Sequence, residues 1–291
     1  METTELLKRV RKIEIKSRGL TNQIFSGQYH SAFKGRGMAF SEVREYNYGD
    51  DIRSIDWNVT ARFDHPYVKI FEEERELTVM LLIDVSGSNN FGTQQQLKTE
   101  KITEIAAVLA FSAIQNNDKV GVVFFSDRIE KFIPPKKGTS HILRIIRELV
   151  DFKAQSNLTD ISEPLRFLTN AIKKRCTAFL LTDFIDTNFS DAIKIASRKH
   201  DLVGIRVIDK REAEIPSVGL LKLRDFESNK TYWVDTSGSE FQETHKIRWQ
   251  QHEKTLHDIF VKSRIDVADV NTDEDFIKPL VKLFKKRESR F

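Results

Sequence analysis

The sequence lacks the features that mark secreted, membrane-spanning and zinc-binding proteins. It has a single cysteine, Cys176, which excludes an intramolecular disulfide or a cysteine-rich zinc site and fits a reducing compartment. No apolar run approaches the roughly 18 residues of a membrane-spanning helix, and no signal-peptide core is present. We therefore expect a cytoplasmic protein without a membrane span.

Charge of neither sign dominates the chain. Among its 291 residues, 47 Lys and Arg and 43 Asp and Glu leave a formal net charge of +4. This small excess does not by itself predict a nucleic-acid binder, and the basic pair Lys136-Lys137 has no interleaved aromatic residues that would stack on bases. We expect no nucleic-acid partner. Hydrophobic residues make up 40% of the chain, enough for a sizeable core.

The most informative stretch runs from Thr78 to Ser88, with the sequence TVMLLIDVSGS. Its short apolar run opens with a β-branched pair, which predicts a buried strand, and polar residues follow where the strand leaves the sheet. In open α/β sheets, ligands bind outside the carboxyl ends of the strands. Asp84, Ser86 and Ser88 can direct three oxygen atoms at one point there, which suits a hard divalent cation such as Mg²⁺.

The rest of the chain alternates between strands and helices. Buried strands are predicted at 120–125, 177–181, 202–208 and 265–270, and a hairpin strand at 128–133. Helices are predicted at 97–115, 141–152, 161–174, 191–200, 240–263 and 273–286. This alternation predicts a doubly wound α/β fold, with a mainly parallel sheet covered on both faces. Polar alternation at 214–236 predicts an added β-hairpin.

The amino-terminal quarter reads as an extension of this domain. Residues 4–16 predict a helix that docks its apolar face and leaves a basic face in solvent, although such a helix can also rest on an anionic membrane. Residues 44–62 predict a helix capped by Asp50 or Asp51. They form either a buttress that packs Trp57 onto the main domain or a partner-docking surface, and we favour the buttress because buried aromatic residues mostly hold structure.

Two further residues are candidates for the site at Asp84. Thr159 lies in a loop just before a helix and offers a third hydroxyl, and Asp183 ends the apolar strand FLLTD and offers a second carboxylate. The set Asp84, Ser86, Ser88, Thr159 and Asp183 resembles the metal-ion-dependent adhesion site (MIDAS) of von Willebrand factor A domains, whose motif is D-x-S-x-S, then a Thr, then an Asp.

The resemblance implies a role for each residue of this set. Both serines and the threonine would bind Mg²⁺ directly, with Mn²⁺ as an alternative, and the two aspartates would act largely through water. An acidic side chain of a protein partner would complete the octahedron. The competing interpretation is that Ser86 and Ser88 cap the following helix. A second D-x-S-x-S, at Asp235 to Ser239, follows a polar segment and predicts a capping box rather than a metal site.

A second resemblance extends beyond the A domain and covers roughly residues 25–285. It rests on Arg44, Tyr46, Gly49-Asp50-Asp51, Arg53, Ile55-Asp56-Trp57, Thr60-Ala61-Arg62, Val68-Lys69 and Phe71-Glu72. These residues resemble the signature of an uncharacterised bacterial family that is commonly encoded beside MoxR-type AAA+ ATPases. The resemblance implies a first part at 1–75, with the helix and buttress, and a von Willebrand factor A-like domain at 76–291. Asn89 departs from the pattern, because A domains often carry an apolar residue there.

The family resemblance implies a non-enzymatic adaptor that works with a MoxR-type AAA+ ATPase in the maturation or assembly of client complexes. Two other functions remain open. A metal-dependent phosphoesterase would use Asp84, Asp183 and Asp209 at strand ends, but such enzymes usually need more direct carboxylates and a nearby base, and no histidine lies in the candidate loops. A nucleic-acid binder would show affinity that falls steeply with salt. His245 and His252 lack a third ligand for zinc.

Overall fold

The computed structural model describes residues 3–21, 39–63, 65–72, 77–90, 97–224 and 230–289. The chain divides into two compact units, one made of Met1–Phe33 and Thr78–Phe291 and the other of Lys34–Leu77. Each unit has its own sheet.

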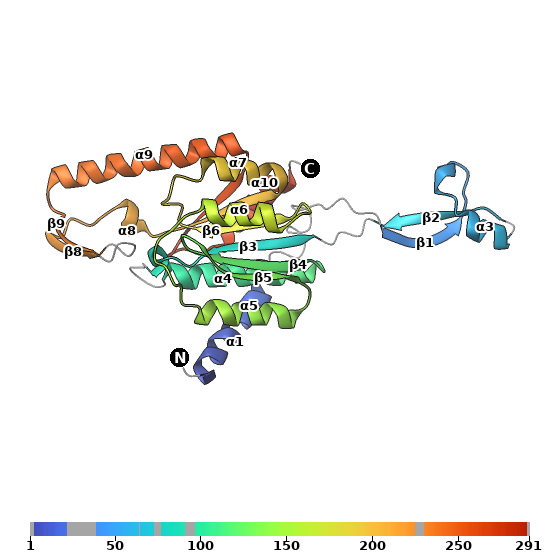
Figure 1. Cartoon of the computed structure of the whole chain (residues 1–291), viewed down its shortest axis with the longest axis horizontal. Helices are drawn as coiled ribbons and strands as arrows, with labels where there is room; N and C mark the ends of the chain where they lie inside the picture. The colour runs from blue at the N-terminus through green and yellow to red at the C-terminus, as the bar shows by residue number, and fades with distance from the viewer. Residues whose placement is uncertain are drawn as a thin grey trace. The chain divides into compact units, whose positions relative to one another are not determined.

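The larger unit is built on a six-stranded sheet with the strand order β10-β7-β6-β3-β4-β5 (Figure 1). Every neighbouring pair is parallel except β4 and β5, which form the expected antiparallel hairpin. The strands are β3 (Thr78–Asp84), β4 (Lys119–Phe125), β5 (Ile129–Lys136), β6 (Thr177–Thr182), β7 (Asp201–Ile208) and β10 (Asp266–Asn271). The predicted doubly wound α/β fold is confirmed.

The central strand β3 is buried and places Asp84 at the carboxyl edge of the sheet. From Val79 to Asp84 every residue is buried, because β3 lies between β4 and β6 and both of its faces are covered. In the register of the sheet, Asp84 pairs with Phe125 of β4, and Ile83 pairs with Leu181 of β6. The carboxyl ends of β3, β4 and β6 therefore lie at the same edge.

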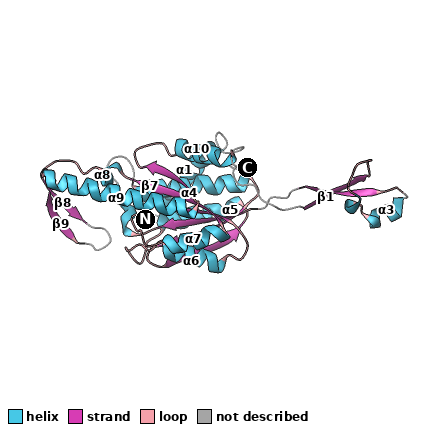
Figure 2. Cartoon of the chain, turned by 90° about the horizontal axis from the view of Figure 1, so that it is seen from above, coloured by secondary structure: helices cyan, strands magenta, loops and turns pink. Residues whose placement is uncertain are grey.

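Helices cover both faces of this sheet (Figure 2). One face packs against three of them in a continuous apolar cluster that includes Met80, Leu165, Ile193 and Leu256. The helices of this face are α6 (Ser162–Ala171), α7 (Ser190–Lys199) and α9 (Ser239–Ser263); the other face carries α4 (Lys98–Gln115), α5 (Thr139–Asp151) and α10 (Ile277–Glu288). None of the described helices combines the length and the apolar character that crossing a membrane requires.

The first helix, α1 (Thr3–Leu20), packs across α4 and α5. Val10 and Ser17 of α1 are buried, Lys16 pairs with Glu104 of α4 at 2.7 Å, and the Arg18 guanidinium lies over the Phe111 ring. These contacts agree with the prediction that this basic helix docks its apolar face onto the domain. The predicted boundary at 75/76 placed the helix with the buttress, whereas its contacts place it in the larger unit.

The segment after β7 forms the expected hairpin. A single turn of helix, α8 (Lys210–Ala213), leads into β8 (Leu220–Arg224) and β9 (Thr231–Asp235), which pair in antiparallel fashion. The hairpin lies beside the amino-terminal end of α9 (Figure 1). Gln242 of α9 fixes this end, because its side-chain amide donates to the carbonyl oxygens of Ile215 and Thr236.

The smaller unit holds the segment expected to be a buttress. The strands β1 (Ala39–Glu45) and β2 (Tyr67–Glu72) pair in antiparallel fashion, with η2 (Ile52–Ser54) and α3 (Trp57–Phe63) between them. The expected single helix is therefore two short ones, because Ile55 bridges to Val68. Asp51 does cap η2, as one of the two predicted caps, and Asp56 accepts hydrogen bonds from the first turn of α3.

Candidate functional site

Asp84 lies at the carboxyl end of β3 and is almost fully buried, with 2% of its surface exposed. One carboxylate oxygen accepts from the Ser86 backbone N–H at 2.9 Å, and the other accepts from the Thr182 hydroxyl at 2.6 Å. Thr182 ends the neighbouring strand β6, so the side chain of Asp84 is fixed by its own loop and by the adjacent strand. Sequence reasoning did not select Thr182.

Ser86 and Ser88 place their hydroxyl oxygens 3.0 Å apart, next to Asp84. They do not cap α4, whose N-cap is Leu97 with no side-chain hydrogen bond. The competing interpretation of these serines as caps of this helix is therefore wrong. Asn89, which departs from the family pattern, is buried and donates its side-chain amide to the Asp84 backbone carbonyl at 3.1 Å. This hydrogen bond stabilises the loop that carries Ser86 and Ser88.

The loop that carries Thr159 is joined to the serine loop by the backbone. Gly87 N–H donates to the Asn157 carbonyl at 3.0 Å, and Asp160 N–H donates to the Ser126 carbonyl at the end of β4 at 3.1 Å. The Thr159 hydroxyl oxygen is inaccessible to solvent and has no hydrogen-bond partner in the described structure. A buried hydroxyl without a partner is unusual in native structures, and a bound ion is one group that would satisfy it.

Asp183 follows β6 and is buried, with 4% of its surface exposed. One of its oxygens accepts from the Ile185 backbone N–H at 3.2 Å. The intervening residue, Phe184, has a φ of 57°, in the left-handed region that costs a bulky residue roughly 1–2 kcal/mol. Backbone strain of this kind is typical of functional sites, and here it lies directly after the second predicted carboxylate.

The two carboxylates influence each other. Burial and the nearby charge of Asp183 raise the pKa of Asp84 from 3.8 to about 6, although the hydrogen bonds from Thr182 and Ser86 oppose the rise. Burial disfavours the charged form, and a second carboxylate adds repulsion. A cation placed between the two groups would relieve both effects, so the electrostatics of this edge favour a positively charged ligand.

Lys98 supplies one positive charge at this edge, and sequence reasoning missed it. It is the first residue of α4 and is fully buried, with its ammonium nitrogen 3.2 Å from an oxygen of Asp183 and in contact with the carboxylate of Glu212. Burial lowers the pKa of Lys98, but the carboxylates of Asp183 and Glu212 outweigh burial, so the pKa is raised. The sequence carried no clear signal, because Lys98 stands in the polar first turn of the predicted helix, next to Thr99, Glu100 and Lys101.

A histidine also approaches Asp183. His252 of α9 lies near the backbone of Phe184 and within electrostatic range of Asp183. Burial and the charge of Arg206 lower its pKa below 6.5. The candidate loops contain no histidine of their own, but the fold brings this one from a distant helix.

Asp209, the third strand-end aspartate, has a structural task. Its carboxylate caps α8 by accepting from Arg211 N–H at 2.9 Å, and it accepts from the Thr272 hydroxyl at 2.9 Å. These bonds connect β7, α8 and the end of β10. Both carboxylate oxygens of Asp209 are therefore engaged in bonds that hold the fold.

The second D-x-S-x-S forms a turn rather than the predicted capping box. Asp235 accepts hydrogen bonds from both the backbone N–H and the hydroxyl of Ser237, at 2.9 and 2.6 Å. The N-cap of α9 is Gly238, which has no side chain to cap with. Asp235 and Ser237 are exposed, whereas Asp84 and Ser86 are buried.

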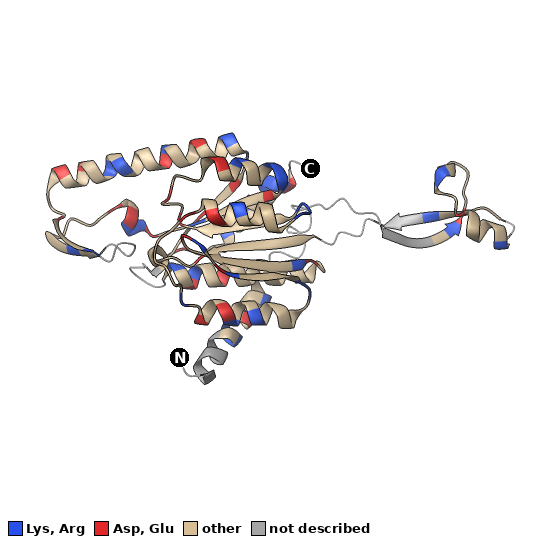
Figure 3. Cartoon of the chain, viewed as in Figure 1, with Lys and Arg blue, Asp and Glu red and all other residues tan. Residues whose placement is uncertain are grey.

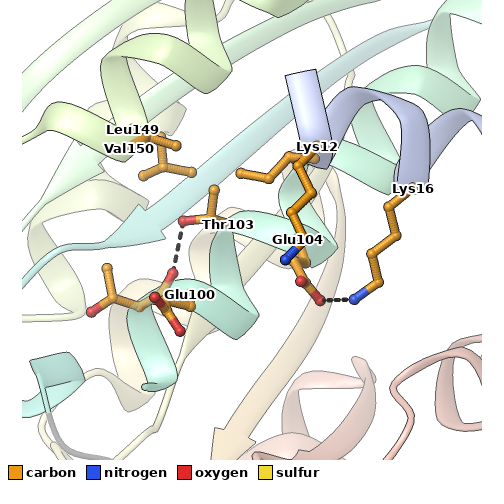
Figure 4. Close-up of a pocket in the computed structure, with 9 residues that line it drawn as sticks. Lys12, Lys16, Glu100, Thr103, Glu104, Leu149 and Val150 are labelled. Atoms are coloured by element: carbon orange, nitrogen blue, oxygen red, sulfur yellow. Dashed lines mark hydrogen bonds and ion pairs between the residues drawn. The ribbon is translucent and has the colours of Figure 1, made fainter. Parts of the chain in front are cut away.

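A cavity of about 280 Å³ lies between α1, α4 and α5 (Figure 4). Leu149 and Val150 line one side, and the ion pair between Lys16 and Glu104 lies on the other. None of the five predicted site residues lines it. Elsewhere on this unit, basic and acidic residues alternate along α9, a pattern that does not make the single-sign surface of a nucleic-acid binder (Figure 3).

The donor set at the Asp84 edge fits a hard divalent cation. Its groups are oxygens: two carboxylates, the paired hydroxyls of Ser86 and Ser88, and the unpartnered hydroxyl of Thr159. In the described part of the chain, no three His, Cys, Asp or Glu side chains are grouped in a way that could hold a metal. A metal at this edge would therefore depend on the hydroxyls.

Two uncharacterised bacterial proteins are similar to this chain in sequence. The chain is 27% identical over 231 residues to the uncharacterized protein Rv1480 of Mycobacterium tuberculosis, covering 78% of this chain and 73% of the relative. It is 25% identical over 122 residues to the uncharacterized protein YeaD of Bacillus subtilis, covering 42% of this chain and 27% of the relative.

Two solved structures were compared with this chain, and the first has a similar architecture. The conserved hypothetical protein BatB from Bacteroides thetaiotaomicron has a TM-score of 0.50 and 17% identity, covering 73% of this chain and 99% of that chain. The VWA domain of SpRpn10 has a TM-score of 0.38 and 12% identity, covering 71% and 94%.

A family model matches residues 42–255, which include most of the smaller unit, the Asp84 loop, Thr159 and Asp183. The family carries the description "Protein of unknown function DUF58". The match spans more than half of the chain, so it confirms the expected membership of an uncharacterised family. The chain belongs to the DUF58 family.

Proposed function

We propose that this protein is a non-enzymatic interaction module that binds Mg²⁺ at the Asp84 edge and, through the metal, an acidic side chain of a protein partner. The metal set is Asp84, Ser86, Ser88, Thr159 and Asp183, with Mn²⁺ as an alternative ion. The family resemblance drawn from the sequence names a MoxR-type AAA+ ATPase as the partner, in the maturation or assembly of client complexes.

The observation that carries this proposal is the convergence of three loops on one buried pair of carboxylates. The serine loop follows β3, the Thr159 loop is bonded to it through Gly87, and Asp183 follows the adjacent strand β6. The hydroxyls of Ser86 and Ser88 hydrogen-bond to each other and do not cap α4. The hydroxyl of Thr159 has no partner in the described structure.

The chain's own residues define what such a site can do. Ser86, Ser88 and Thr159 would hold the ion through neutral oxygens, while Asp84 and Asp183 would act largely through water. When bound, Mg²⁺ supplies an under-neutralised positive charge with coordination positions left for an outside anion. Asp84 is already oriented by Thr182 and Ser86, so the site needs little rearrangement on its β3 side.

Calorimetric titration with Mg²⁺ and Mn²⁺ tests the metal site. We expect Asp84→Ala, and the isosteric Asp84→Asn, to weaken binding by about a hundredfold or more, because each removes a carboxylate that orients the site. The matched control is Asp235→Ala, which alters the same motif in its exposed turn and should leave the affinity unchanged. Loss of binding in Asp235→Ala with retention in Asp84→Ala would reverse the site assignment.

The partner is tested by capture from native lysate with immobilised wild-type protein. We expect an AAA+ ATPase to be retained with Mg²⁺ and lost with EDTA or with Asp84→Asn. Retention that ignores both changes would place docking on another surface, with the smaller unit as the next candidate.

The phosphoesterase alternative is favoured by one observation, the approach of His252 to Asp183. It predicts metal-stimulated hydrolysis of phosphoesters that is lost in both Asp84→Asn and His252→Asn. We expect no such activity from purified protein. The carboxylate of Asp209, which the phosphoesterase would need as a metal ligand, instead caps α8 and accepts a hydrogen bond from Thr272.

A further inference from the structure

Lys98 is an unusual residue to find fully buried. Its side chain is fully buried, with 0% of its surface exposed, although it opens a helix next to a candidate cation site. Lysine is almost never fully buried unless it is paired. Its ammonium nitrogen bonds to Asp183, one of the predicted metal residues, and to Glu212 of α8.

Glu212 is itself held in place. Its carboxylate accepts from the Asp209 backbone N–H at 3.1 Å, as the second half of the capping box of α8. Asp209 in turn accepts from Thr272 beyond β10. The ammonium of Lys98 is therefore shared between one carboxylate of the candidate site and one carboxylate that the fold holds next to it.

The charges around Lys98 do not balance on their own. Asp84, Asp183 and Glu212 contribute three carboxylates, and Lys98 contributes one ammonium, so these four groups carry a net charge of −2 when all are ionised. Uncompensated buried charge is costly. One divalent cation would bring the four groups to neutrality, and a second would not.

We propose that Lys98 is the internal counter-cation of this site: it competes with the divalent cation for Asp183, and Glu212 retains the ammonium when the metal takes Asp183. Lys98 thereby sets the affinity of the site and limits it to one divalent cation. This inference rests on the proposed metal site.

The competition predicts opposite effects for removing the charge of Lys98 and for removing the charge of Glu212. Lys98→Met keeps the length of the side chain and removes the competing ammonium, so we expect Mg²⁺ to bind about tenfold more tightly. Glu212→Gln leaves the ammonium with Asp183 alone, so we expect binding about tenfold weaker. Both affinities are measured by calorimetric titration, with one ion bound per chain in each case.

Lys101→Met is the matched control for charge. Lys101 lies one turn further along α4, is largely buried, and donates to the Glu274 carbonyl at 3.0 Å. Removing its charge without touching Asp183 should change the Mg²⁺ affinity by no more than about twofold. An effect as large as that of Lys98→Met would overturn the inference, since general charge rather than competition would then explain both.

Lys98→Met leaves two buried carboxylates without their cation, so a second variant protects the test from misfolding. The double variant Lys98→Met/Glu212→Gln removes one charge of each sign, and it should bind Mg²⁺ more tightly than Glu212→Gln alone. Saturating Mg²⁺ should also raise the melting temperature of Lys98→Met more than that of wild type.

The outcomes separate the two proposals. If wild type shows no Mg²⁺ binding that depends on Asp84, the metal site fails and this inference fails with it. If wild type binds but Lys98→Met and Glu212→Gln both weaken binding, the metal site stands, and Lys98 merely supports the structure.

Discussion

Cys176 and His200 form a buried pair at the amino end of β6. The sulfur lies 3.2 Å from Nδ1 of the imidazole, and Nε2 has no hydrogen-bond partner in the described structure. Burial raises the pKa of the Cys176 thiol to about 12, and burial with the charges of Lys199 and Arg175 lowers the pKa of His200 to about 4. Both groups are therefore neutral at pH 7, and the cysteine is the core thiol expected from the sequence rather than a nucleophile.

The low pKa of His200 predicts a pH-dependent stability. As the pH falls below about 6.5, the unfolded chain takes up a proton that the folded chain refuses until about pH 4, so the free energy of unfolding decreases across that window. We expect His200 to account for ~2 kcal/mol of this loss after allowance for solvent screening. Urea unfolding of wild type and His200→Gln from pH 7.5 to 4.5 measures it. Parallel curves for the two proteins would contradict the assignment.

At the scale of single elements, the close packing of β3, β4 and β5 leaves no room for a side chain at Gly121. A Cβ atom at Gly121 would lie 2.7 Å from the Met80 sulfur and 2.9 Å from the backbone nitrogen of Pro135. We expect Gly121→Ala to lower the free energy of unfolding by about 1–3 kcal/mol, because backbone of β5 has to move. Gly19→Ala, in α1 with no atom within 4 Å of its Cβ, is the control and should stabilise the protein slightly. Equal urea midpoints for the two variants would contradict this.

Sequence reasoning succeeded where local pattern decides the structure. The strands and helices of the larger unit follow the predicted order, because apolar periodicity is strong in each, and the α/β fold follows from their alternation. The single helix expected from 44–62 was wrong, because Ile55 pairs with Val68 of the following strand, β2, and this pairing interrupts the helix. Pairing of this kind leaves little local signal.

Some residues of the candidate site were predictable from local sequence, and others were not. Asp84, Ser86 and Ser88 follow one strand, so their proximity was predictable from the motif. Lys98 was not, because it meets Asp183 and Glu212 across 85 and 114 residues of sequence. Its place in the polar first turn of a predicted helix gives no sign of burial until α4 and α8 are packed together. His252 was missed for the same reason.

At the scale of the whole molecule, the two units differ in how much they bury. The larger unit has the apolar cluster beneath α6, α7 and α9, whereas in the smaller unit only Val68 and Asp56 are buried among the side chains that the structure describes. Its order comes instead from polar contacts, including the two hydrogen bonds from Arg44 to Asp50 at 2.8 Å. A two-stranded sheet with so small a core is marginally stable by itself.

Native-state hydrogen exchange should therefore show the smaller unit opening first. We expect amides of β1 and β2 to lose protection at lower urea concentration than amides of β3, β4 and β6, because little buried apolar surface opposes their opening. Mass spectrometry of peptic peptides from the intact chain measures both sets in one sample. Loss of protection at the same urea concentration would mean that the larger unit stabilises the smaller one, as the buttress interpretation requires. Earlier opening would leave Tyr48 and Trp57, both exposed on the smaller unit, free to serve as a docking surface.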